Sequence, residues 1–321
     1  NTSGVNTAVG YRAMDANTTG ISNVAVGEDA LGANVAGDQS VAVGYEALLV
    51  QNPSGNADMN NTAVGYRAGY ATTTGQENTF IGSSAGVANT TASYNTAIGH
   101  TALDANTTGA DNVAVGRNAL GANTTASNNT ALGTNALGSS TTANSNVALG
   151  TNAGDAITTG NQNIALGVGA LGALTTTSGN IAIGYNAMDA GVDGVQNCVA
   201  IGTDALGALT ASGSGTTPNI GIGYGALAGC TTGTTNIAIG SWAANAGTVT
   251  GNSNIAIGHA SMTALTSGGT NTAVGHGSGQ AVTTGSNNTF IGSTAGDAVT
   301  TGSENTFVGS AAGGAQTTSS N

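Results

Sequence analysis

A glycine closes a short apolar run eighteen times along this chain of 321 residues. One such run is Asn95-Thr96-Ala97-Ile98-Gly99. Thirteen of the seventeen gaps between successive glycines of this kind are 17 residues long, two are 18 and two are 21. A fixed period indicates a repeat architecture, in which each unit buries its apolar face only against its neighbours. We therefore expect residues 1–321 to form a single repeat domain, and we interpret it as a segment of a longer fibre.

The repeating unit has the composition of a β-structure. We number it from the first residue of the apolar run, so that Asn95 is position 1, Gly99 is position 5 and Asp111 is position 17. Five residues of strand character are followed by a polar turn, a stretch of small residues and a second turn, and recurring glycines and Thr-Thr pairs disfavour a helix. The unit predicts an all-β, parallel β-solenoid of about 18 coils, with two short strands per coil and equivalent residues stacked ~4.8 Å apart.

Position 1 is asparagine in sixteen of the eighteen units, and the exceptions are Ser40 and Cys198. A column of asparagines can form hydrogen bonds along the stack. Together with the glycine column, it predicts a structural ladder rather than a catalytic site. Representative members are Asn95, Asn112, Asn129, Gly99, Gly116 and Gly133.

A volume argument predicts which residues face the interior. All three phenylalanines occupy position 3, and position 9 of the same units is glycine. The pairs are Phe80 with Gly86, Phe290 with Gly296, and Phe307 with Gly313. Position 3 is usually alanine and position 9 usually Leu or Met elsewhere, and pairing large with small is what a close-packed interior requires. We therefore expect positions 3 and 9 to share the interior of the coil.

Positions 2 and 4 then face outward, because alternate residues of a strand point to opposite sides. They form a continuous aliphatic stripe that exceeds the apolar surface of an ordinary soluble monomer. We interpret this stripe as an interface between chains. Its predicted core consists of Ile164, Leu166, Ile181, Ile183, Ile237, Ile239, Ile255 and Ile257.

The unit Asn-Thr/Val-Ala-Val/Ile-Gly-x-x-Ala resembles the repeat of the left-handed parallel β-roll in the heads of YadA-like trimeric autotransporter adhesins. It is also similar to the NTAVG-type repeats of bacteriophage tail-fibre proteins, and the resemblance covers essentially the whole chain. The 17-residue coil and its Thr-Thr-Gly turn differ from the shorter adhesin repeat. The resemblance implies a left-handed roll, a homotrimer and an extracellular location. The expected function is that of a structural or adhesive fibre, the shaft or head of a surface adhesin or phage tail fibre, which presents a binding tip to host glycan or protein.

Composition argues against several other functions. Three arginines and no lysine stand against fifteen acidic residues, a net charge of −12, which disfavours nucleic acid. No 18-residue apolar stretch is present, so we expect no membrane insertion. Ser and Thr follow the repeat and no GxxxxGK motif occurs, so we expect neither an enzyme nor a cofactor.

Metal-ligating residue types are present but scattered. His100, His259 and His276 occupy position 6 of different coils, and we interpret them as exposed turn residues, although the last two lie one coil apart. Cys198 and Cys230 lie in different registers of the repeat, which favours two free thiols. Aspartates at position 10 are interpreted as solvated turn carboxylates, so no metal site is predicted. They are Asp15, Asp104, Asp155, Asp189 and Asp297.

Three further features are candidates for recognition. The two 21-residue gaps place four-residue loop insertions near residues 51–59 and 212–218, with Pro53 and Pro218 in them. Trp242, the only tryptophan, directly follows Ser241 in a turn that we expect to be exposed. Threonine occupies position 13 in fifteen coils, and such a column raises ice binding, or binding to another ordered surface, as the alternative function.

Overall fold

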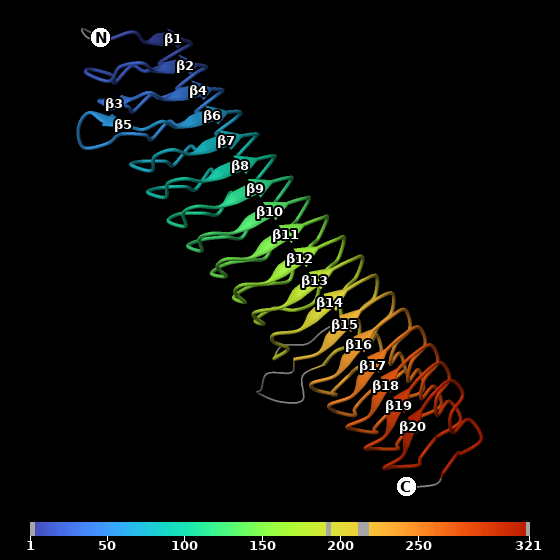
Figure 1. Ribbon diagram of the computed structural model, residues 1–321. Helices are drawn as coiled ribbons and strands as arrows, with labels where there is room; N and C mark the ends of the chain where they lie inside the picture. The colour runs from blue at the N-terminus through green and yellow to red at the C-terminus, as the bar shows by residue number, and fades with distance from the viewer. Residues whose placement is uncertain (1–3, 191–193, 211–217, 319–321) are drawn as a thin grey trace. The chain divides into compact units, whose positions relative to one another are not determined.

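The computed structural model describes residues 4–190, 194–210 and 218–318, and within them the chain is all-β with no helix (Figure 1). It divides into two compact units, residues 1–159 (unit 1) and 160–321 (unit 2). Each unit is a parallel β-solenoid in which one three-residue strand per coil stacks on the strand of the next coil, as Figure 1 shows. The predicted fold class is therefore confirmed. The trimer and the handedness of the coil stay predictions.

The strands of unit 1 are β1 (Thr7–Val9), β2 (Val24–Val26), β3 (Gly37–Asp38), β4 (Val41–Val43), β5 (Ala57–Asp58), β6 (Thr62–Val64), β7 (Thr79–Ile81), β8 (Thr96–Ile98), β9 (Val113–Val115), β10 (Thr130–Leu132) and β11 (Val147–Leu149). Those of unit 2 are β12 (Ile164–Leu166), β13 (Ile181–Ile183), β14 (Val199–Ile201), β15 (Ile220–Ile222), β16 (Ile237–Ile239), β17 (Ile255–Ile257), β18 (Thr272–Val274), β19 (Thr289–Ile291) and β20 (Thr306–Val308).

The glycine at position 5 follows each three-residue strand and fixes the coil. Gly116 has a φ of +134°, a region that residues with a side chain rarely adopt. A Cβ atom placed on Gly116 would lie 2.5 Å from the carbonyl oxygen of Gly133, the equivalent glycine of the next coil. Conformation and space therefore both require glycine at this position, which explains why the period is so visible in the sequence.

The prediction of two strands per coil is wrong. Apart from the two-residue pair β3–β5 and one bridge between Cys230 and Val249, the described residues form a single strand per coil. The reason is conformational, because positions 7, 9 and 17 take a left-handed backbone with φ near +55°, as Thr101, Leu103 and Asp111 do. Left-handed residues at alternate positions bend the chain into turns and prevent a second strand.

Leucine at position 9 is the least expected of the residues with a left-handed backbone. A left-handed conformation costs a leucine about 1–2 kcal/mol, and full burial of its side chain contributes about 1.5–3 kcal/mol. Leu103, Leu120 and Leu137 are all completely buried at φ values of 51–54°. No β-branched residue occupies position 9 in any coil, which fits the greater strain that such residues meet there.

Positions 3 and 9 share the interior, as the volume argument predicted. Phe80 and Phe290 are fully buried, and a side chain on Gly86 or Gly296 would collide with the ring of its own coil. Each ring also requires a glycine at position 9 of the preceding coil. These additional glycines, which the sequence analysis did not identify, are Gly69 for Phe80 and Gly279 for Phe290.

Position 12 is a further buried column, and its chemistry differs between the units. In unit 1 it holds Asn17, Asn34, Gln51, Thr72, Asn89, Asn106, Asn123 and Ser140, followed by Ile157. In unit 2 the equivalent interior residues are Leu174, Leu209, Cys230, Val249, Leu265, Val282 and Val299.

Candidate interaction surface

The outward side chains of the strands form the first part of this surface. In β10, Thr130 and Leu132 are exposed while Ala131 between them is fully buried. In β17, Ile255 and Ile257 are half-buried on either side of the buried Ala256. Positions 2 and 4 therefore point away from the interior in both units, and we call these two columns the outer stripe.

The eight residues predicted as the core of a chain interface all lie in the outer stripe of unit 2. Ile239 is 37% exposed, and the other seven are half-buried. In unit 1, position 2 is either Thr or Val, and Leu149 at position 4 is 48% exposed. The longest branched side chains thus gather in β12–β17, where aliphatic neighbours in adjacent coils partly cover one another.

Position 6 carries exposed tyrosines in some of the coils, which the sequence analysis did not identify. Five of the seven tyrosines occupy it, with exposed fractions of 41–69%, namely Tyr11, Tyr45, Tyr66, Tyr185 and Tyr224. The signal was available in the sequence, because each of these tyrosines directly follows the glycine of its unit. These tyrosines follow position 4 by two residues, across the glycine at position 5.

Aromatic rings of adjacent coils contact each other. The rings of Tyr45 and Tyr66 stack with centroids 5.4 Å apart, and hydrogen bonding to Glu46 together with its charge raises the pKa of Tyr45. Trp242, which is 42% exposed at position 7, meets Tyr224 edge-on at 4.6 Å. The only tryptophan therefore belongs to an aromatic pair formed by adjacent coils.

The asparagines at position 1 form a hydrogen-bonded ladder in the interior. The backbone NH of Asn112 donates to Oδ1 of Asn95 at 3.0 Å, and that of Asn129 donates to Oδ1 of Asn112 at the same distance. The Nδ2 group of Asn95 donates to the carbonyl of Gly109 at 2.9 Å. These side chains are fully buried, so their role is to connect coils.

The threonines at position 13 use their hydroxyl groups in the same way. Thr90 donates to the carbonyl of Thr107 at 2.9 Å, and Thr107 donates to that of Thr124 at 3.0 Å. In unit 2, Thr283 donates to the carbonyl of Thr300 at 3.1 Å. These hydroxyl protons are engaged between coils, which weakens the basis for an ordered-water surface at this column.

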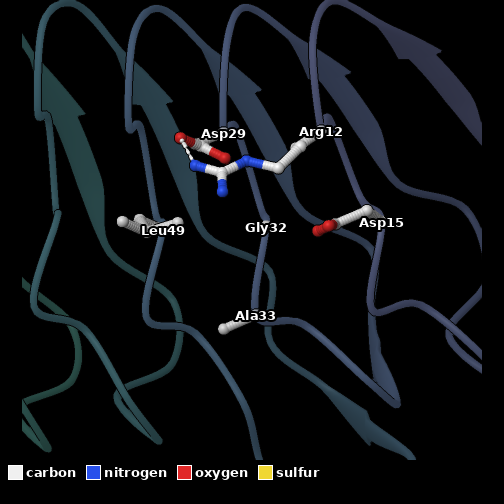
Figure 2. Close-up of a pocket in the computed structure, with 6 residues that line it drawn as sticks. All are labelled: Arg12, Asp15, Asp29, Gly32, Ala33 and Leu49. Carbon is white, nitrogen blue, oxygen red and sulfur yellow. Dashed lines mark hydrogen bonds and ion pairs between the residues drawn. The ribbon is translucent and has the colours of Figure 1, made fainter.

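A shallow depression in unit 1 gathers charged side chains (Figure 2). Nη2 of Arg12 lies 2.6 Å from Oδ2 of Asp29, and Figure 2 shows the guanidinium group extended towards this carboxylate, with Asp15 on the other side. Hydrogen bonding to Asp29 and its charge raise the pKa of Arg12. Gly32, Ala33 and Leu49 complete the lining, so the polar side chains of the depression are Arg12 and two aspartates, one of them ion-paired with it.

The two insertions are only partly described. Pro53 is buried, and it lies beside the interior near Gly37, so it shapes its loop and does not present a contact surface itself. The exposed residues of this loop include Asn56, which accepts a hydrogen bond from Thr19, and Asp58, which accepts one from Gln39. Pro218 is exposed, and residues 212–217 of the second insertion lie outside the described residues.

Titratable groups are mostly dispersed. Among the described residues there is no cluster of three or more His, Cys, Asp or Glu side chains that could hold a metal. Cys198 and Cys230 are buried thiols that are not joined in a disulfide, and burial raises the pKa of Cys230 to about 12. Burial also raises the pKa of the half-buried position-10 carboxyls, shown by Asp104, Asp155 and Asp189.

Two histidines are the exception to this dispersal. The imidazole rings of His259 and His276 stack with centroids 5.3 Å apart, whereas His100 has no second histidine beside it at position 6.

None of the described segments contains a helix long and apolar enough to cross a membrane. Comparisons with protein-family models, with curated proteins and with solved structures gave no match to this chain.

Proposed function

We propose that this chain is a segment of a non-enzymatic extracellular fibre. It serves as the shaft or head of a trimeric surface adhesin or phage tail fibre and presents a binding tip to host glycan or protein. The observation that carries this proposal is the outer stripe, an unbroken series of outward Val, Ile, Leu and Thr side chains within each unit. Contiguous apolar surface of this kind typically marks a protein interface.

The proposed mechanism is mechanical. Ladders of buried asparagines and glycines hold each coil in register with the next, and a solenoid so connected is stiff along its stacking direction. The outer stripe of each copy packs against the stripes of two others, which removes it from water. The net negative charge then keeps assembled fibres apart in solution.

Sedimentation equilibrium of the full chain tests the proposal. We expect a mass near three times 30.4 kDa. The double variant Ile237→Thr and Ile255→Thr should shift the distribution towards monomer, because it removes aliphatic surface while placing at position 2 a residue that β18 and β19 carry naturally. A matched control is Thr284→Ala, which alters an exposed turn residue away from the stripe.

A stable monomer at all protein concentrations would contradict the proposed assembly. Equal dissociation of the stripe variant and the turn control would show that the outer stripe is not the interface. Unchanged far-UV circular dichroism in both variants would establish that any change in mass reflects assembly rather than unfolding.

A further inference from the structure

His259 and His276 form a parallel pair on the surface of unit 2. Their ring centroids are 5.3 Å apart and their planes differ by 7°. Both residues occupy position 6 of successive coils, one glycine after the ends of β17 and β18, and both are exposed. Their side chains therefore emerge from the same face with the spacing of neighbouring strands.

The backbone fixes this arrangement on both sides of the pair. Ile257 in β17 is paired in register with Val274 in β18, two residues before each histidine. The carbonyl of His259 accepts a hydrogen bond of 3.0 Å from the NH of Gly277, which follows His276. The carbonyl of His276 accepts a 2.8 Å hydrogen bond from the NH of Thr294 in the next coil. The two Cα positions are thus held while the side chains stay free to rotate.

The ring nitrogens of this pair are available to a ligand. Within the described part of the chain, neither imidazole makes a hydrogen bond or an ion pair, and the only contact of this kind is their mutual stacking. His100 differs in this respect, because its Nδ1 lies 3.3 Å from the hydroxyl of Thr101 and no second histidine is adjacent. The chain therefore contains its own comparison between a paired and a single histidine in the same column.

We propose that His259 and His276 together bind one divalent late transition-metal ion. Metal–nitrogen bonds of about 2.0–2.1 Å require the two donor nitrogens to approach within about 3 Å of each other, which a rotation of two exposed side chains achieves at strand spacing. Water molecules complete the coordination. Imidazole suits Cu²⁺, Ni²⁺ and Zn²⁺, and the general order of affinities places Cu²⁺ first.

Unit 2 contains no lysine or arginine that would repel a cation. Residues 160–321 contain five acidic residues, Asp189, Asp193, Asp204, Asp297 and Glu304, and no lysine or arginine, so their net formal charge is −5. All three arginines of the chain lie in unit 1. The neighbours of the pair in the position-6 column are Ser241 and Ser293, which are small and neutral. Approach of a divalent ion is therefore not opposed by a basic group of this unit.

Titration of the full chain with Cu²⁺ in the presence of glycine as a weak competitor tests this site. We expect one tight Cu²⁺ per chain, with two imidazole nitrogens visible in the electron paramagnetic resonance spectrum. His259→Ala and His276→Ala should each weaken binding by roughly tenfold or more and leave one imidazole nitrogen, because a single ligand cannot chelate. His100→Ala is the matched control and should leave the tight site unchanged.

Equal affinity in the wild-type chain and His259→Ala would overturn the proposal, and so would a comparable loss in His100→Ala. A Cu²⁺-dependent increase in mass by sedimentation, with less than one tight ion per chain, would show a site shared between copies and would also overturn it. All three substitutions replace exposed side chains, and far-UV circular dichroism should confirm that each variant is folded.

Discussion

Units 1 and 2 build the same coil but fill its position-12 column with opposite chemistry. In unit 1, Nδ2 of Asn106 donates to Oδ1 of Asn89 at 3.1 Å and to the carbonyl of Gly109 at 2.9 Å, and Asn123 donates to Oδ1 of Asn106 at 3.0 Å. In unit 2, Leu265 occupies the same slot and is completely buried. The same coil conformation therefore accommodates either an amide ladder or an aliphatic column at position 12. The residues that determine this conformation must lie at other positions of the repeat.

The amide ladder of unit 1 runs through Asn89, Asn106 and Asn123. Asn123 is followed in the column by Ser140, whose shorter side chain does not continue the series, and Oδ1 of Asn123 and Oγ of Ser140 are both buried without a hydrogen-bond partner. A buried polar atom without a partner costs about 1–3 kcal/mol. The next residue of the column, Ile157, is apolar. A polar column thus depends on its neighbours, whereas an aliphatic column can be interrupted at lower cost.

The largest expected effect comes from replacing the glycine at position 5, which both units share. Gly116 in unit 1 and Gly240 in unit 2 have φ values of +134° and +135°, and a Cβ atom on either would lie 2.5 Å from the carbonyl oxygen of the next glycine in the column. We expect Gly116→Ala and Gly240→Ala each to destabilise its own unit by about 4 kcal/mol, through backbone strain and overpacking together. Hydrogen exchange read by mass spectrometry would locate the loss of protection.

Two glycines with open surroundings serve as controls for this comparison. A Cβ atom on Gly55 in unit 1 or Gly247 in unit 2 meets nothing within 4 Å. Replacement of either by alanine should change stability by less than about 0.5 kcal/mol. If the position-5 variants were as mild as these controls, the glycine column would not be what specifies the coil.

The next largest loss of stability is expected from substitutions at position 12, where the two units differ. Leu265→Asn places an amide in an aliphatic column without a ladder on either side, and we expect a loss of about 3 kcal/mol. Asn106→Leu removes partners from Asn89, Asn123 and Gly109, and we expect a loss of about 2 kcal/mol. Urea unfolding followed by far-UV circular dichroism measures both, and the fluorescence of Trp242 reports on unit 2 alone.

A double substitution tests whether the asparagines at position 12 stabilise unit 1 cooperatively. Asn106→Leu combined with Asn123→Leu should cost less than the sum of the two single substitutions, because the second change removes groups that the first left without partners. Additive losses would show that the asparagines contribute independently and that unit 1 contains no cooperative ladder at position 12.

Positions 1, 3 and 5 were predictable because their chemistry is nearly invariant along the sequence. The glycine period, the asparagine ladder and the pairing of Phe80 with Gly86 follow from residue types whose geometry allows few alternatives. The left-handed turn at position 9 was not predictable in this way, since Leu103 and Leu120 are ordinary residues whose burial outweighs their backbone strain. The tyrosines at position 6 were not predicted, because they occupy this position in only five of the eighteen coils.

The smallest expected effect uses the one ionisable side chain described in the aliphatic column. Burial raises the pKa of the Cys230 thiol from 9.0 to about 12, with a contribution from nearby Cys198, while a hydrogen bond with the backbone of Gly233 acts in the opposite direction. The folded pKa exceeds the unfolded one, so the stabilising contribution is fully present below pH 9 and is lost as pH rises from 9 towards 12. The loss is about 1.4 kcal/mol per pH unit in that window, or about 2 kcal/mol at pH 10.5.

Cys230→Val isolates this contribution, because valine already occupies the same column at Val249, Val282 and Val299. Urea unfolding between pH 8 and pH 10.5 should show a steeper loss of stability in the wild-type chain than in the variant, while tyrosine ionisation affects both equally. Parallel pH profiles would mean that water reaches the thiol in the folded state. In that case the interior of unit 2 would be less apolar than its aliphatic column suggests, and the contrast with the amide ladder of unit 1 would lie in side-chain packing rather than in exclusion of charge.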